Sequence, residues 1–117
     1  MTPEGKVKAA AKKVLSDAQA WHYMPVQNGM GRVGIPDLIA CVPITITPNM
    51  VGKRVGVFVA VETKAPGKDK NTTPNQKRNL EGIHEAGGMA VATSDSDLVR
   101  EALNVLRLTG VPMFFVP

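Results

Sequence analysis

Two acidic residues and a lysine lie at the borders of apolar sequence, in Ile35-Pro36-Asp37 and in Val61-Glu62-Thr63-Lys64. In a β-strand, residues i and i+2 point to the same face, so Glu62 and Lys64 are predicted to project together. We expect strand pairing to bring Asp37 to the same place. Two carboxylates favour a hard divalent cation, and a lysine beside them suits an anionic substrate. The pattern therefore indicates hydrolysis of a phosphodiester.

Each of these groups has a role in that chemistry and also a simpler explanation. Asp37 and Glu62 would hold Mg²⁺ or Mn²⁺, which polarises a phosphate and lowers the pKa of bound water. Lys64 would stabilise the developing negative charge, and the backbone carbonyl of Thr63 is a further candidate metal ligand. The alternatives stay open, because Asp37 also suits a turn and Glu62 can form a structural ion pair with Lys64.

Two more polar residues are candidates for the same site. Glu4 falls in the first turn of a predicted helix, where the macrodipole favours an acid. Its spacing from Val7 and Ala11 nevertheless places it on the apolar face, pointing inward, as a third carboxylate. Gln76 follows Thr73 by three residues and is expected to complete a capping box. From that position Gln76 is also able to reach a metal-bound water or the substrate.

Hydrophobic periodicity and turn residues predict the element order α-β-β-α-β-α-β. The first helix begins at Thr2-Pro3, and its apolar stripe extends to Trp21. Residues 37–47 and 54–64 are predicted strands, and the short connection between them favours antiparallel pairing as a hairpin.

The second half of the chain alternates helices and strands. Thr73-Pro74 opens a helix that Gly87-Gly88 ends, and the remaining elements are a buried strand at 89–93, a helix at 96–109 and a strand at 111–116. The helix between strands 54–64 and 89–93 favours parallel pairing with a right-handed crossover. The expected fold is α/β, with a mixed sheet flanked by helices.

Length and composition bound the class of protein. The 117 residues, 44% of them hydrophobic, suit one small globular domain. No apolar stretch is long enough for a transmembrane helix, and the basic start of the chain is unlike a signal peptide. The single cysteine, Cys41, excludes an internal disulfide and a cysteine-based zinc site, and it fits a core thiol in the cytoplasm.

The net charge of +4 is unevenly distributed. Residues 1–80 carry twelve basic and five acidic side chains, whereas residues 81–117 carry two basic and five acidic ones. A basic half favours a polyanion such as nucleic acid, with a merely solvated basic surface as the alternative. The candidate DNA-binding residues are Lys6, Arg32, Lys53, Arg54, Lys68, Lys70 and Lys77.

Taken together, these residues resemble the virus-type replication-repair nuclease domain, VRR-NUC, of the PD-(D/E)XK nuclease superfamily. The matching segments are Glu4, Asn28-Gly29, the run from Gly34 to Ala40, Val61-Glu62-Thr63-Lys64, Pro74-Asn75-Gln76 and the run from Gly87 to Val91. The resemblance spans nearly the whole chain. The Pro-Asp and Glu-X-Lys elements alone are weak motifs, but their order with an upstream Glu and a downstream Gln is specific.

The resemblance implies a restriction-endonuclease-like fold, one nuclease domain over residues 1–117, and cleavage of DNA with Mg²⁺ or Mn²⁺. By matched position, Glu4, Asp37 and Glu62 would be metal ligands, Lys64 the catalytic lysine and Gln76 an auxiliary site residue. Family members include standalone phage and bacterial proteins and the nuclease domains of larger repair enzymes.

Standalone members of this size are associated with homodimers and with branched DNA such as four-way junctions. The expectations are therefore a homodimer acting on DNA, with no membrane, no small-molecule cofactor, and a cytoplasmic location (the host cytoplasm for a phage protein). The long run between Asp37 and Glu62 departs from the family pattern and suits a dimer or DNA contact. The alternative function is a non-catalytic nucleic-acid-binding module on the same fold.

Overall fold

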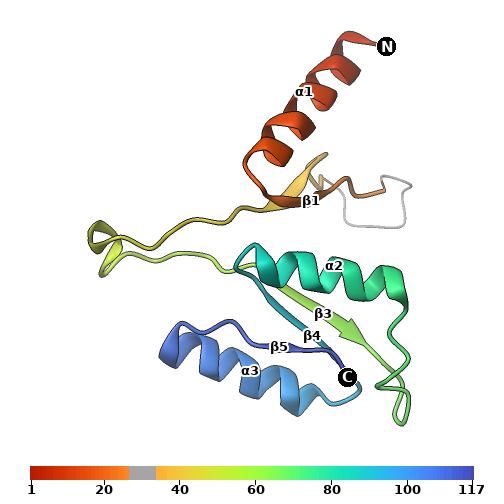
Figure 1. The fold of residues 1–117 in the computed structure, drawn as a ribbon, viewed down its shortest axis with the longest axis vertical. Coiled ribbons are helices and arrows are strands. Elements are labelled where there is room, and N and C mark those ends of the chain that lie inside the picture. The colour runs from red at the N-terminus through yellow and green to blue at the C-terminus, as the bar shows by residue number, and fades with distance from the viewer. Residues whose placement is uncertain (27–33) are drawn as a thin grey trace. The chain divides into compact units, whose positions relative to one another are not determined.

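The computed structural model describes residues 1–26 and 34–117, and these form two compact units, Met1–Pro43 and Ile44–Pro117 (Figure 1). The prediction of a single domain stays a prediction, and each unit is described by itself. The elements are α1 (Pro3–Asp17), β1 (Trp21–Tyr23), β2 (Ile39–Cys41), the 3₁₀ helix η1 (Pro48–Met50), β3 (Val59–Thr63), α2 (Pro74–Glu85), β4 (Met89–Thr93), α3 (Ser96–Thr109) and β5 (Phe114–Phe115).

Helix α1 begins where the sequence predicts and ends earlier. The Thr2 hydroxyl accepts a hydrogen bond from the backbone N–H of Gly5 at 2.9 Å, which confirms the N-cap. At the other end Gln19 has a left-handed φ of 61°, and the N–H of Ala20 bonds to the carbonyl of Leu15. This is a Schellman ending built without glycine, so the sequence lacks the usual stop residue.

The chain then forms a strand that the sequence does not predict. Strand β1 pairs antiparallel with β2, with Trp21 opposite Cys41 and Tyr23 opposite Ile39. In the described residues β2 pairs with β1, and β3 pairs with β4. The predicted hairpin between residues 37–47 and 54–64 would join the two units, and it stays a prediction. Cys41 is buried, as expected for a core thiol.

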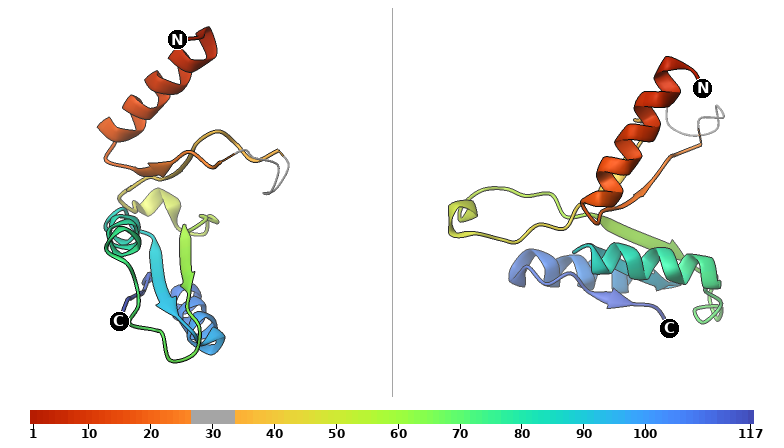
Figure 2. Two further views of the ribbon diagram at one scale, coloured as in Figure 1. Left: turned by 90° about the vertical axis from the view of Figure 1, so that its right-hand side faces the viewer. Right: turned by 45° about the horizontal axis from the view of Figure 1, so that its top comes forward.

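The second unit contains a three-stranded parallel sheet in the order β3-β4-β5. Helices α2 and α3 lie on opposite faces of this sheet, as the left view of Figure 2 shows. Every residue of the central strand β4 is buried. Met89 and Val91 form a core with Ala102 of α3, so the alternate residues Ala90 and Ala92 face α2.

Local sequence explains these elements well. Helix α2 begins with the predicted capping box and ends before Gly87, and α3 covers the predicted residues and ends at Gly110, whose φ is 73°. The parallel pairing of β3 and β4 is confirmed. Gly88 is required by a close approach, because a Cβ there would lie 2.7 Å from Ile83 Cγ2 and 3.0 Å from the Phe58 carbonyl oxygen.

The structure is thus mixed α/β, with helices packed on a small sheet. Among the residues that the structure describes, none of the helices has the length and apolar character needed to cross a bilayer.

Candidate active site

The polar cluster of the second unit begins at the carboxyl end of β3. Glu62 lies opposite Ala92 in the register, on the face of the sheet covered by α2. The backbone N–H of Lys64 donates to the carbonyl of Thr93 at 2.9 Å, which continues the ladder by one bond. Glu62 and Lys64 therefore share a face as predicted, and Lys64 Nζ lies 3.5 Å from Glu62 Oε1.

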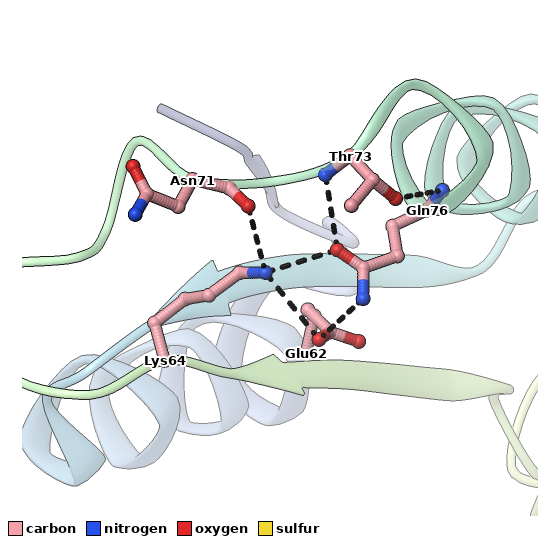
Figure 3. Close-up of polar contacts among 5 residues, drawn as sticks. All are labelled: Glu62, Lys64, Asn71, Thr73 and Gln76. Atoms are coloured by element: carbon pink, nitrogen blue, oxygen red, sulfur yellow. Dashed lines mark hydrogen bonds and ion pairs between the residues drawn. The ribbon is translucent and has the colours of Figure 1, made fainter.

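Gln76, at the start of α2, connects this pair to the helix (Figure 3). Its Oε1 accepts from the N–H of Thr73 at 3.0 Å and from Lys64 Nζ at 2.9 Å, while its Nε2 donates to Glu62 Oε1 at 3.0 Å. The Thr73 hydroxyl completes the capping box by accepting from the N–H of Gln76. Gln76 therefore caps α2 and also contacts Glu62 and Lys64, and its predicted reach to a metal-bound water or the substrate stays a prediction.

The ammonium group of Lys64 has three acceptors. These are Gln76 Oε1 at 2.9 Å, the backbone carbonyl of Asn71 at 3.3 Å and Glu62 Oε1 at 3.5 Å. A lysine has three N–H donors, so the three acceptors match its full capacity. The Lys64 side chain is only 10% exposed, and a charge this enclosed needs such partners. The ion pair with Glu62 that the sequence left open is therefore present.

The carboxylate of Glu62 uses one oxygen in these contacts. In the part of the chain that the structure describes, the bonds from Lys64 and Gln76 both reach Oε1. The side chain is 32% exposed. Oε2 is thus a hard oxygen donor of the kind that Mg²⁺ and Mn²⁺ prefer, and Glu62 fits the predicted cation.

The two other predicted acids lie in the first unit, together with a lysine. Lys8 Nζ is 3.9 Å from Glu4 Oε1 and 3.9 Å from Asp37 Oδ2. The Glu4 side chain is 76% exposed, so nothing within the first unit covers it, and its predicted orientation toward the shared site stays a prediction. Val7, on the same stripe of α1, is exposed as well. Within the first unit, therefore, this stripe of α1 is exposed.

The shared metal site stays a prediction. Asp37 belongs to the first unit and Glu62 to the second, and each unit is considered by itself. No group of three or more His, Cys, Asp or Glu side chains able to hold a metal occurs within residues 1–26 and 34–117. Thr63 is the last residue of β3, and the role of its carbonyl as a ligand likewise stays a prediction.

The predicted DNA-binding residues are exposed where the structure describes them. This set comprises Lys6 in α1, Lys53 and Arg54 after η1, Lys68 and Lys70 in the loop before α2, and Lys77 in α2. Arg32 lies outside the described residues, as do Asn28 and Gly29. The exposure of these cations fits contact with a polyanion and fits a solvated surface equally.

Three residues that contact the predicted site residues or their loop, one in the first unit and two in the second, are absent from the sequence prediction. Lys8 follows Glu4 by four residues on a helix, a spacing from which at least that pair was predictable. Asn71 contributes a backbone carbonyl, which no side-chain pattern reveals. Asp69 binds Ser94, 25 residues away, through Oδ1 to the hydroxyl at 2.7 Å and through Oδ2 to the N–H at 3.0 Å.

The bonds from Ser94 change the ionisation of Asp69. The hydroxyl bond, and after it the backbone N–H bond, stabilise the carboxylate and hold its pKa below the ordinary value.

Comparison with known proteins found no matching family model, no matching curated protein and no matching solved structure. Functional inference therefore rests on the residues described above.

Proposed function

We propose that this protein is a metal-dependent DNA endonuclease of the VRR-NUC type, with a restriction-endonuclease-like fold and a preference for branched DNA such as four-way junctions. One observation carries the proposal. The Glu-X-Lys carboxylate and ammonium at the end of β3 are joined to the Gln of α2 by hydrogen bonds of 2.9 and 3.0 Å. In this proposal the acid helps to bind the metal ion, the lysine faces the phosphodiester, and the amide holds both side chains in position.

Glu62, Asp37 and Glu4, with the Thr63 carbonyl, are the groups that would hold Mg²⁺ or Mn²⁺. When bound, such a cation supplies Lewis-acid polarisation of the phosphate and a water of lowered pKa. The assignment is supported by the all-oxygen donor set and by Oε2 of Glu62, which takes no part in the bonds from Lys64 and Gln76 among the described residues.

Lys64 supplies a positive charge that is fixed before substrate arrives. Its contact with Glu62, at 3.5 Å, is the longest of its three, and the ammonium also donates to Gln76 and Asn71. Exchange of the Glu62 contact for a phosphate oxygen would leave the lysine in place. A charge held ready in this way stabilises the transition state without reorganisation.

The surrounding cations would bind the DNA backbone. Lys68, Lys70 and Lys77 are exposed and belong to the loop and helix that supply Asn71 and Gln76. Phosphate contacts of this kind position DNA independently of sequence and weaken as salt rises. A homodimer would present two such sites, as paired cleavage of a symmetric junction requires.

The test is cleavage of plasmid DNA and of a four-way junction with Mg²⁺ or Mn²⁺, against EDTA. The matched control for Lys64→Ala is Lys13→Ala, because Lys13 also pairs with an acid but is exposed. We expect metal-dependent cleavage by the wild type and by Lys13→Ala, and a loss of about 100-fold or more for Lys64→Ala.

Equal activity of Lys64→Ala and the wild type would overturn the proposal. Salt-sensitive DNA binding without metal-dependent cleavage, unaffected by Asp37→Ala apart from its charge, would establish the non-catalytic binding module instead.

A further inference from the structure

The loop at residues 65–72, between β3 and α2, is tied to the end of β4 by a single side chain. Both carboxylate oxygens of Asp69 accept hydrogen bonds from Ser94, one from the hydroxyl at 2.7 Å and one from the N–H at 3.0 Å. Ser94 directly follows Thr93, the last residue of β4. We call this pair of bonds the Asp69–Ser94 clasp.

The same end of β4 also holds the backbone of Lys64. The carbonyl of Thr93 accepts from the N–H of Lys64 at 2.9 Å. Thr93 therefore anchors the backbone at the start of the loop, and the next residue, Ser94, anchors the middle of the loop through Asp69. A shift of the clasp relative to Thr93 would move the loop relative to the Lys64 backbone.

Asp69 lies inside the second of two consecutive turns, which lead to the acceptor of Lys64. The N–H of Lys68 bonds to the carbonyl of Ala65, and the N–H of Asn71 bonds to the carbonyl of Lys68, each at 2.9 Å. The carbonyl of Asn71 then accepts from Lys64 Nζ at 3.3 Å. The path from the clasp to this carbonyl is two residues long, so little slack separates them.

We propose that Asp69 is a positioning residue, which through the clasp with Ser94 holds the Asn71 carbonyl against the Lys64 ammonium. The consequence for catalysis rests on the proposed nuclease function, whereas the effect on Lys64 does not. The lowered pKa of Asp69, caused first by the Ser94 hydroxyl, shows that these bonds favour the charged carboxylate. A charged acceptor with two oxygens makes stronger bonds to Ser94 than a neutral side chain.

A loop anchor with no role in the site predicts different results. Lys68 and Lys70 flank Asp69 and are exposed. Loss of the clasp in that case would disturb DNA contacts and raise KM, or lower thermal stability, without a fall in kcat. Positioning of Lys64 instead predicts a fall in kcat with little change in KM.

The first experiment measures Lys64 directly in the protein without metal or DNA. Asp69→Asn keeps the size of the side chain but leaves one oxygen for two donors. Asp17→Asn is the control, because Asp17 is an exposed acid paired with Lys13. Reductive methylation is followed by peptide mass spectrometry, with exposed Lys12 as the internal reference.

We expect Lys64 to be modified roughly five-fold or more faster in Asp69→Asn, the change expected on loss of a net hydrogen bond. Asp17→Asn should match the wild type. Unchanged protection of Lys64 in folded Asp69→Asn would overturn the proposal. If that variant fails to fold, Ser94→Ala, which keeps the backbone N–H donor, gives the decisive measurement with the same expected direction.

The second experiment measures junction cleavage. We expect kcat of Asp69→Asn to fall about ten-fold, with KM within about two-fold, because small misplacement of a catalytic group is costly. Ser94→Thr keeps a hydroxyl at this position, so its kcat should be higher than that of Ser94→Ala. An active wild type with unchanged kcat in Asp69→Asn would overturn the positioning role alone. An inactive wild type would overturn the nuclease proposal, and the modification rate of Lys64 would still decide the role of Asp69.

Discussion

The two units each bring a lysine to acidic side chains, but they hold it very differently. In the second unit, Lys64 has three acceptors at 2.9 to 3.5 Å, one of them the amide of Gln76. In the first unit, Lys8 lies 3.9 Å from each of two acids, both on exposed side chains. The difference is the neutral amide, which orients the ammonium and the carboxylate together. A charge pair becomes a prepared site only when a third group fixes its geometry.

The elements around the two lysines also differ in burial, and the element near Lys64 is the more buried one. Strand β4 beside Lys64 is buried at every position, whereas α1, which carries Lys8, has no buried residue. Side chains on a rigid, enclosed element keep their positions more accurately than those on an exposed helix. We therefore expect the second unit to carry most of the sensitivity to substitution.

The largest effect should separate the two lysines. Lys64→Ala is expected to lower cleavage about 100-fold or more, because a prepared charge is lost. Lys8→Ala should change the rate about five-fold at most, as for an exposed ion pair. Single-turnover cleavage of a junction with both variants measures the ratio. Equal losses would remove the distinction between the two units.

The next effect separates the two roles of Gln76. Gln76→Ala removes the capping bond and the bonds to Glu62 and Lys64, so we expect a loss of about 1 kcal/mol in stability and about ten-fold or more in kcat. Gln76→Glu keeps an acceptor for the Thr73 N–H but brings a second carboxylate to Glu62. The melting temperature of Gln76→Glu should therefore fall less than that of Gln76→Ala, although its cleavage rate should still be low. Full activity in Gln76→Ala, with a lowered melting temperature, would reduce Gln76 to a cap.

A third substitution probes the packing of the second unit. Gly88→Ala is expected to destabilise by about 1 to 3 kcal/mol, because its Cβ would meet the Ile83 side chain and the Phe58 backbone. Gly56→Ala is the control, since nothing lies within 4 Å of its Cβ position. Urea unfolding of both variants gives the comparison, and equal midpoints would contradict it.

The smallest effect concerns acid. Because the folded-state pKa of Asp69 is lowered, its contribution to stability is complete above the ordinary aspartate pKa of about 3.9. The contribution disappears as the pH falls through the lower pKa of the folded protein. The melting temperatures of the wild type and Asp69→Asn should therefore differ by a constant amount near neutral pH and converge in acid. If the difference between the two melting temperatures increased in acid, the direction of the pKa shift of Asp69 would be contradicted.

Sequence patterns predicted the second unit well because its structure follows local rules. The capping box at Thr73, the stop at Gly87 and the helix over residues 96–109 each depend on neighbouring residues. The shared face of Glu62 and Lys64 follows from strand geometry alone.

The first unit was predicted less well for physical reasons. The end of α1 uses Gln19 in a left-handed conformation, where a pattern search expects glycine. The pairing of β1 with β2 joins residues about twenty positions apart, and neither the short run of β1 nor its periodicity identifies its partner strand. The Asp69–Ser94 clasp was unpredictable for a similar reason, because two polar loop residues 25 positions apart carry no periodicity.

Asn71 touches Lys64 through its main chain, and this has a consequence for how related proteins are compared. Every amino acid has a backbone carbonyl, so the residue type at position 71 can change while the acceptor for Lys64 is retained. Asn71→Ala should accordingly be silent in the cleavage assay. The length of the loop is what evolution must keep constant here, and an insertion of one residue beside Asn71 would be more harmful than any exchange of its side chain.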